Sequence, residues 1–287
     1  MKIARVIINS NIYISLAAVL LCIETQIQLG MRPQVHPYLF IIFFATLFEY
    51  NLHRLITILT NPDALNDEKH SWVKRYPIHF YALVAISMLG FMVAVALAKR
   101  EVILTLAPLA LITILYSMPF FKNSIYLYRL RDIPFLKIFL IAFVWSSATI
   151  LLPIIQSGQV FDKTHVGMML LERFFFVFAI TIPFDIRDME VDRQHGLKTL
   201  PLLVGKKMAL GIANGTLAVF ILLCLYHYSK SAEPAVLLAL VLSSLIALVF
   251  INNKELSKLP YYHYGLLDGT MLLQGLLVLA SYYIHIH

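Results

Sequence analysis

Long apolar runs alternate with short polar connections along the whole chain. Runs of roughly 20 residues are long enough to cross a bilayer as a helix, and nine such runs are present. They cover residues 6–28, 38–60, 78–98, 102–121, 134–155, 166–184, 207–228, 234–252 and 264–285. These runs are too long and too continuous for the strands of a membrane barrel. The pattern therefore predicts an all-α, polytopic membrane protein, a bundle of about nine transmembrane helices.

Composition and segment boundaries support one membrane domain. The 287 residues are 60% hydrophobic and 14% charged, with a mean hydropathy of +0.79, which is more apolar than a soluble domain needs. No tail or linker divides the chain, so we expect residues 1–287 to form a single transmembrane domain. Asn9 and Asn11 interrupt the first run and no cleavage site follows it, which favours a permanent span over a signal peptide. Cys22 and Cys224 both fall inside predicted spans, which argues against a disulfide framework.

Lysines and arginines are divided unequally between the two sides of the predicted bundle. With the N-terminus in the cytoplasm, that side holds 16 of the 23, the opposite side holds five, and two lie within spans. The positive-inside rule then places the N-terminus in the cytoplasm and the C-terminus on the opposite side. The polar connections 61–77, 122–133, 185–206 and 253–263 all face the cytoplasm on this topology. The basic excess is read as a topological signal, and we expect no nucleic-acid partner.

Ionisable residues inside predicted spans usually face a cavity or a partner. Glu172 and Arg173 are adjacent and cannot face each other on a helix. They lie toward the outer end of their span, so we expect them to reach the interface by snorkelling. Asp268 is near the cytoplasmic end of the last span, where it either contributes to a cavity or accepts hydrogen bonds from a neighbouring helix.

Three aspartates, Asp185, Asp188 and Asp192, lie at the end of the sixth apolar run. At about 100° per residue, positions 185 and 192 nearly coincide around a helix and 188 lies about 60° away. Unpaired, three carboxylates on one face would repel one another. A hard divalent cation such as Mg²⁺ would relieve that repulsion. The alternative is a solvated helix end on which Asp188 and Glu190 pair with arginines, and the spacing alone does not separate the two.

Basic residues follow or interleave with these acids, and their side chains bind diphosphate oxygens well. They are Arg187, Arg193, Lys198, Lys206 and Lys207. Gly196 and Pro201 end the helix after the acids, so that the basic residues can fold back over them. A membrane cavity that holds metal and cations but has apolar walls fits a substrate with a phosphorylated head and a long hydrocarbon tail.

Two segments carry a resemblance to a known family. The sequence DIRDMEVDRQHGLKTLPLLVG, from Asp185 to Gly205, resembles the second aspartate-rich motif of UbiA-type intramembrane prenyltransferases. The sequence LYSMPFFK, from Leu115 to Lys122, is similar to the end of that family's fourth helix. Nine spans with the motif after the sixth agree with the family's architecture. The resemblance covers nearly the whole chain in architecture and about thirty residues in motif.

The resemblance implies a helix bundle around a central cavity, with two aspartate-rich motifs that hold Mg²⁺ on the diphosphate of an isoprenoid donor. It implies a transferase that moves the prenyl group to a small lipophilic or aromatic acceptor at the bilayer. The catalytic and metal-side residues carried over are Asp185, Asp188 and Asp192, and those that contact substrate or line the cavity mouth are Tyr116, Lys122, Arg193 and Lys198. The connections 61–77 and 185–206 would be the cytoplasmic active-site loops.

The first aspartate-rich motif departs from the family's pattern. The family has Asn-Asp-x-x-Asp near the end of its second helix, and the corresponding residues here are Asn51, Leu52, His53, Arg54 and Leu55. Asn51 matches and both aspartates are leucines. Asn51 and Arg54 are expected to contact substrate, with Arg54 neutralising phosphate directly, because a guanidinium suits phosphate geometry.

Three other functions are weighed against the transferase. Within the same fold, the protein could be an isoprenoid cyclase, or a non-catalytic isoprenoid-lipid-binding or accessory membrane protein. A transporter is disfavoured, because the polar residues gather at one mouth of the bundle rather than near mid-membrane. No feature of the sequence points to a particular oligomeric state.

Overall fold

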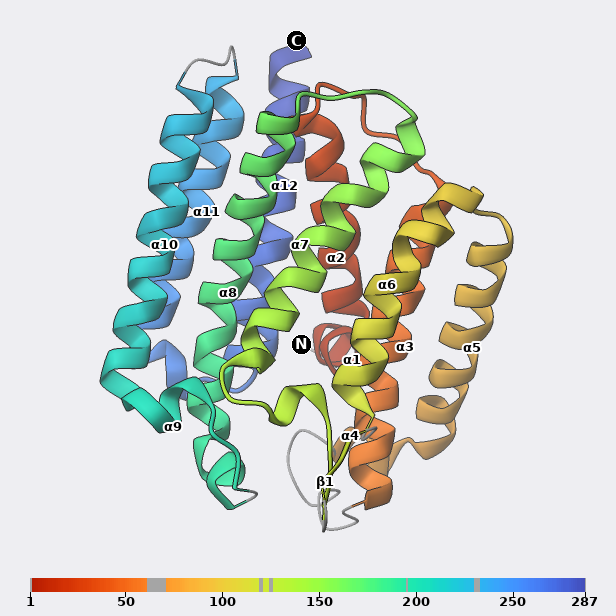
Figure 1. Ribbon diagram of the computed structural model, residues 1–287, viewed down its shortest axis with the longest axis vertical. Coiled ribbons are helices and arrows are strands. Elements are labelled where there is room, and N and C mark those ends of the chain that lie inside the picture. The colour runs from red at the N-terminus through yellow and green to blue at the C-terminus, as the bar shows by residue number, and fades with distance from the viewer. Residues whose placement is uncertain are drawn as a thin grey trace.

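A computed structural model describes residues 2–60, 71–118, 121–123, 126–194, 196–229 and 233–286. Twelve α-helices account for most of this described chain (Figure 1). They are α1 (Lys2–Asn9), α2 (Ile12–Gln28), α3 (Pro37–Thr60), α4 (Ser71–Arg75), α5 (Pro77–Ala96), α6 (Arg100–Ser117), α7 (Leu136–Ser157), α8 (Lys163–Gln194), α9 (Leu200–Val204), α10 (Lys206–Tyr228), α11 (Pro234–Asn252) and α12 (Asp268–Ile286). A π-helical turn, η4 (Tyr262–Leu267), leads into α12.

A two-stranded hairpin is the one sheet among the described residues. Strands β1 (Phe121–Asn123) and β2 (Tyr126–Tyr128) pair antiparallel, with Lys122 opposite Leu127. The hairpin, α4 and α9 lie at the lower end of the bundle in Figure 1. The predicted helical membrane bundle is therefore confirmed, with this short hairpin as an addition at one end.

Eight of the described helices are long and apolar enough to cross a membrane, and α2 is a shorter apolar helix of 17 residues. Together they correspond to the nine predicted spans. Large apolar side chains such as Ile78 on α5 and Leu104 on α6 are exposed on the outer surface. Such a surface is stable against lipid tails, whereas its exposure to water would be unfavourable.

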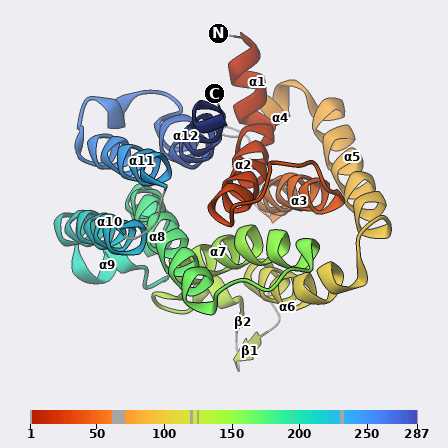
Figure 2. The same ribbon diagram turned by 90° about the horizontal axis from the view of Figure 1, so that it is seen from above.

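The helices form a ring in nearly chain order, which is visible from above in Figure 2. α2 packs on α3, α3 on α5, α6 on α7, α7 on α8, α8 on α10, and α10 on α11. α12 then closes the ring by packing on α2, and α2 also contacts α7 across the middle. Gly275 permits α12 to approach α2 closely, because a Cβ there would lie 2.8 Å from the backbone oxygen of Leu20.

The first apolar run does not form one continuous span. The helix breaks at Ser10 and Asn11, where Asn11 adopts a left-handed conformation with φ of 64°. Short polar side chains tolerate that conformation better than most, which accounts for an asparagine at this position. α1 therefore projects away from the ring (Figure 2), and the expectation of a single span over 6–28 is wrong at its start.

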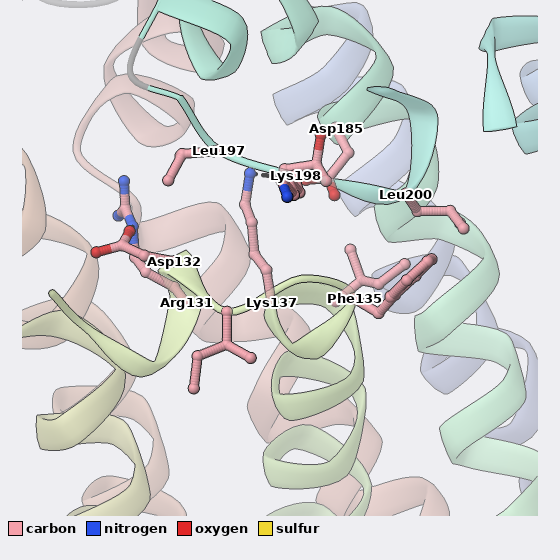
Figure 3. A pocket seen from close by; sticks show the side chains of 11 residues that line it. Arg131, Asp132, Phe135, Lys137, Asp185, Leu197, Lys198 and Leu200 are labelled. Atoms are coloured by element: carbon pink, nitrogen blue, oxygen red, sulfur yellow. Dashed lines mark ion pairs between the residues drawn. The ribbon is translucent and has the colours of Figure 1, made fainter. Parts of the chain in front are cut away.

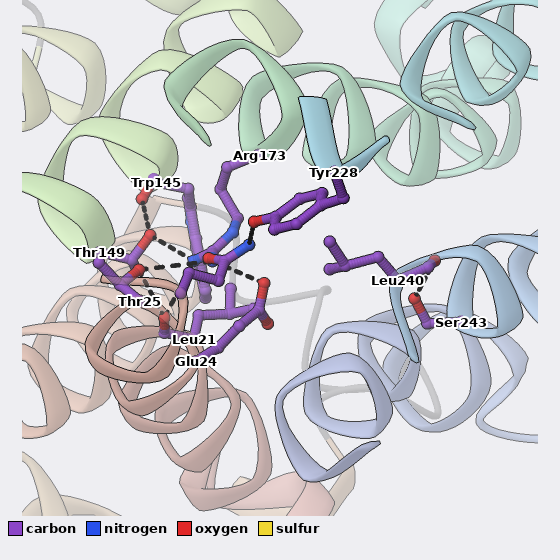
Figure 4. A network of polar contacts seen from close by, with 10 residues as sticks. Leu21, Glu24, Thr25, Trp145, Thr149, Arg173, Tyr228, Leu240 and Ser243 are labelled. Atoms are coloured by element: carbon purple, nitrogen blue, oxygen red, sulfur yellow. Dashed lines mark hydrogen bonds and ion pairs between the residues drawn. The ribbon is translucent and has the colours of Figure 1, made fainter. Parts of the chain in front are cut away.

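Arg173 and Glu172 are buried in the bundle, so their predicted snorkelling is wrong. Arg173 is 3% exposed and forms an ion pair of 2.7 Å with Glu24 of α2 (Figure 4). Its other guanidinium nitrogen donates to the carbonyl oxygen of Leu21 and to the hydroxyl of Thr149. The carboxylate and these acceptors come from neighbouring helices, and they satisfy the charge inside the bundle instead of at the interface.

A second chain of polar contacts runs from Glu172 to the C-terminal end of α10. Glu172 accepts a hydrogen bond of 2.6 Å from His227 Nδ1, and Nε2 of the same ring lies 2.7 Å from His165 Nδ1. The second nitrogen of His165 lies 2.9 Å from the carbonyl oxygen of Gln28. This chain connects α8 and α10 to the end of α2. The same helix α2 carries Glu24, the ion-pair partner of Arg173.

Candidate functional site

A cavity of about 310 Å³ lies among α3, α6, α7, α8 and the start of α12. Charged and titratable side chains gather on its wall, four of them acidic, four basic and one a histidine. They are Glu49, Asp185, Asp188 and Asp268, then Arg54, Arg131, Lys137 and Arg187, and His53. With the histidine neutral, the formal charge of the empty cavity is balanced.

The cavity changes character along α7. Lys137 lies at the start of that helix, and Ile141, Val144 and Trp145 follow on the cavity wall. At about 1.5 Å per residue, Trp145 lies about 12 Å further along the helix axis than Lys137. Ile112 of α6 adds to the same apolar region. One cavity thus joins a charged end to an apolar depth.

The aspartates are presented by a continuation of α8 beyond its apolar part. This helix runs for 32 residues, from Lys163 to Gln194, so residues 185–194 are helical rather than a loop. Gly196, at φ 69°, then ends the helix. Its NH donates to the backbone carbonyl of Arg193, and the NH of Leu197 donates to the backbone carbonyl of Asp192. This pair of bonds is the Schellman arrangement, in which glycine removes the steric penalty of a positive φ.

Asp185 and Asp192 both point at Lys137 of α7. The ammonium lies 2.7 Å from Asp185 Oδ1 and 3.7 Å from Asp192 Oδ2. Figure 3 shows Lys137 extended toward Asp185, with the segment that carries Leu197 and Lys198 passing close by. The side chain of Lys137 is 17% exposed, that of Asp185 is 3% exposed and that of Asp192 is 9% exposed. This group of charges is therefore largely shielded from solvent.

Asp188 makes a different ion pair. Both of its oxygens accept hydrogen bonds from Arg187, at 2.6 and 2.9 Å. Arg187 also donates to the hydroxyl of Tyr264 at 2.7 Å, and its guanidinium lies over the rings of Tyr264 and Phe184. Two aromatic faces and a bidentate carboxylate thus hold a cation at the cavity wall.

On α3, Asn51 supports the helix break between α1 and α2. Asn51 is fully buried, accepts a hydrogen bond from Asn11, and donates to the carbonyl oxygens of Ser10 and Leu47. It is absent from the cavity wall, as are Leu52 and Leu55 at the positions where the family has aspartates. The side chain with the family-like identity therefore satisfies the backbone freed by the break.

Arg54, one turn further along α3, does line the cavity. Its guanidinium donates to the carbonyl oxygen of Asn9 at the end of α1, and its buried Nε has no hydrogen-bond partner. Nearby, Arg131 donates to a ring nitrogen of His53 at 2.5 Å. The α3 side of the cavity therefore presents Arg54 and His53 near the positions where the family has aspartates.

The remaining predicted residues are distributed as follows. Tyr116 lines the cavity, and Lys198 lines a small pocket beside Lys137 and Asp185. Arg193 is exposed and pairs with Glu190, outside the cavity wall. The backbone of Lys122 lies in β1, while its side chain is outside what the structure describes. The predicted loop 61–77 is also largely outside the described residues, and only its end is seen, as α4.

Lys137, Tyr264 and Arg131 are among the cavity residues that the sequence did not single out. Lys137 follows directly on a polar connection and looks like one more cytoplasmic lysine, and its place opposite Asp185 depends on how α7 packs against α8. Asp268, left open from the sequence, lies on the cavity wall.

The donor set of α8 fits one hard cation. Among the described residues, no three His, Cys, Asp or Glu side chains converge on a single metal position. Asp185 and Asp192 nevertheless point at one shared cation, and the buried Asp192 Oδ2 has no hydrogen-bond partner. One or two carboxylates, completed by water and phosphate oxygens, is the usual protein contribution to bound Mg²⁺. The α3 wall offers no matching carboxylates at positions 52 and 55.

Comparisons with known proteins agree on one family and one fold. The model of the UbiA prenyltransferase family matches residues 76–259. The bacteriochlorophyll synthase 33 kDa chain of Cereibacter sphaeroides is 26% identical over 106 residues, which is 33% of this chain and 35%, about a third, of that protein.

Solved structures are similar over almost the whole chain. A UbiA homolog from Archaeoglobus fulgidus bound to GPP and Mg²⁺ has a TM-score of 0.63 at 17% identity, covering 94% of this chain and 99% of that one. The apo UbiA homolog from Aeropyrum pernix K1 has a TM-score of 0.58 at 15% identity, covering 96% and 98%. At these identities the likeness shows a common fold.

Proposed function

The chain belongs to the UbiA prenyltransferase family, and on that premise we propose that it is a Mg²⁺-dependent intramembrane transferase. It moves a prenyl group from an isoprenoid diphosphate to a small lipophilic or aromatic acceptor. The eight long apolar helices and the family membership make it an integral, multi-pass membrane protein.

The observation that carries the proposal is the two-part cavity. Its charged end, with Arg187 and Lys137, suits a diphosphate, and its apolar depth, with Ile141 and Trp145, suits a hydrocarbon chain. A substrate with only one of these parts would occupy only one of the two regions of the cavity.

The charge of the cavity supports a metal requirement. Four acids and four bases already balance in the empty cavity, so a diphosphate brings negative charge that the side chains alone do not neutralise. The Archaeoglobus homolog was solved with GPP or DMAPP together with Mg²⁺. Asp185, Asp188 and Asp192 would hold the ion, which when bound neutralises the diphosphate as the carbon–oxygen bond breaks.

The other side chains bind, orient and shield. Arg54 and Arg187 would donate to phosphate oxygens in the charged end, where both already line the cavity. Tyr50, Tyr116 and Tyr264 also line the cavity, and the face of an aromatic ring can stabilise positive charge on the prenyl carbon. Lys198, on a segment beside Asp185, and Arg193, near the end of α8, remain proposed diphosphate contacts. Lys122 remains a proposed residue of the cavity mouth.

The missing acids of the first motif favour a second candidate. With leucines at 52 and 55, and with Asn51 engaged in the helix break, the α3 wall supplies no metal ligands at those positions. A non-catalytic isoprenoid-binding or accessory protein, or a cyclase in which the donor also serves as nucleophile, would use the same cavity.

For orientation, we propose that the charged end of the cavity opens to the cytoplasm. The lysine and arginine excess of the connections at that end supports this orientation. The C-terminus then lies on the opposite side of the membrane.

The functions can be separated by following diphosphate release from purified protein. Geranyl, farnesyl and geranylgeranyl diphosphate would each be supplied with Mg²⁺, with and without a set of aromatic and lipid acceptors. Release that needs an acceptor supports the transferase, and release from donor alone supports a cyclase. If the donor binds but no diphosphate is released under any condition, the protein is a non-catalytic isoprenoid-binding protein.

A further inference from the structure

The shared ion pair of Lys137 is unusual because one cation serves two acids. Asp185 and Asp192 are seven residues apart on α8, two turns, so their side chains lie on one face. The ammonium makes a hydrogen-bonded ion pair with Asp185 at 2.7 Å, while its 3.7 Å distance from Asp192 Oδ2 is too long for a hydrogen bond. One positive charge thus faces two negative ones, and Asp192 Oδ2 stays buried without a hydrogen-bond partner.

Lys137 also lines a small pocket, and the one other carboxylate that the structure describes on the wall of that pocket is already paired. Besides Asp185, the charged side chains there are Arg131, Asp132 and Lys198. Asp132 is already engaged by both the side chain and the backbone of Arg129. On that side, an ammonium displaced from Asp185 would face Arg131 and Lys198. In the larger cavity, which Lys137 also lines, Asp188 is already paired with Arg187 and Glu49 accepts from Ser117, so an anion that enters the cavity gives the ammonium a stronger partner.

We propose that Lys137 is a tethered cation that holds the metal position of the donor-free protein. Mg²⁺ then binds tightly only together with the anionic head of the substrate, because that head gives the displaced ammonium a new partner. This rests on the proposed function for the identity of the anion, a diphosphate. The exchange moves no proton and breaks no covalent bond: the ammonium passes from carboxylate to phosphate oxygen, and the metal takes its place.

The same charges explain why such a lysine is useful in a membrane cavity. Two buried carboxylates without a cation would be costly whenever substrate is absent. The lysine removes most of that cost and keeps Asp185 and Asp192 oriented on one point. Binding of metal and donor becomes mutually dependent, and by linkage each raises the affinity of the other by the same factor.

The test measures binding of Mn²⁺, a paramagnetic substitute for Mg²⁺, by electron paramagnetic resonance on the purified full-length protein without donor. We expect weak binding to the native protein and binding to Lys137→Met at least about tenfold tighter, within the 5–150-fold range common for coupled sites. Lys137→Arg keeps the charge and should stay weak. Lys137→Met combined with Asp185→Asn should lose the gain, since one of the two carboxylates is gone. Native protein that binds Mn²⁺ without donor as tightly as Lys137→Met would overturn the proposal.

A second arm uses the native protein, so that the proposal does not depend on a variant that folds. The probe is an unreactive thio analogue of geranyl diphosphate, whose diphosphate is still anionic but does not leave the prenyl group. It should raise Mn²⁺ binding above the sum of binding to the protein alone and to the analogue alone. The analogue should in turn bind more tightly when Mn²⁺ is present. If metal binding is independent of the analogue although the analogue binds, Lys137 does not couple the two. If the analogue does not bind at all, the proposed substrate is wrong. The role of Lys137 is then still tested by comparing donor-free Mn²⁺ binding of the native protein with that of Lys137→Met.

Discussion

Removing the guanidinium of Arg173 should strongly destabilise the bundle. Arg173→Met leaves the carboxylate of Glu24 buried without its ion pair, and it also removes donors to Leu21 and Thr149. Breaking a buried pair from one side costs about 3–5 kcal/mol. For a chain of this size we convert at about 2–4 °C per kcal/mol, which predicts a fall in melting temperature of about 10 °C.

The protein carries its own reporters for this measurement. Cys22 and Cys224 are free and fully buried, so a thiol-reactive fluorogenic dye labels them only as the bundle opens. Arg193→Met is the matched control, since it removes the same side chain from an exposed pair on the same helix, worth about 0–1 kcal/mol. The double variant Arg173→Met with Glu24→Gln should recover part of the loss. Equal melting temperatures for Arg173→Met and Arg193→Met would refute the reasoning.

Other consequences can be measured with the same preparations. Gly275→Ala should lower the melting temperature by several degrees because its Cβ meets the backbone of α2, whereas Gly211→Ala, with open space around it, should not. Asn51→Leu should cost about 1–3 kcal/mol, because it removes the partner of the Asn11 amide and of the Ser10 carbonyl, again read from the melting temperature. Asp188→Asn should raise the Mg²⁺ concentration needed for half-maximal diphosphate release, and Glu190→Gln, exposed two residues further along α8, should leave it unchanged.

The membrane bundle could be predicted because hydrophobic periodicity and run length act locally. Each apolar run from the second onward corresponds to a described helix. The break at Ser10 and Asn11 escaped because a 23-residue apolar run is long enough to span, and what ends the helix is a set of hydrogen bonds from α3. A local pattern does not contain that partner.

The site was predictable on one helix and not across helices. The spacing of Asp185, Asp188 and Asp192 places them together because they share α8. Their partners could not be assigned, since the approach of Lys137 depends on the packing of α7 and that of Tyr264 on the turn before α12. Arg173 was misjudged for the same reason, because only the folded bundle shows that Glu24 of α2 lies beside it.

The central claim is that this cavity transfers a prenyl group, and the most direct measurement follows the group itself. Purified protein in lipid would receive isoprenoid diphosphate labelled in the hydrocarbon chain, Mg²⁺ and an acceptor mixture, and the products would be separated by chromatography. The account predicts label in a new lipophilic product with the native protein, and little or none with Asp185→Asn. Label that binds to the protein and is recovered only as unchanged diphosphate would contradict it.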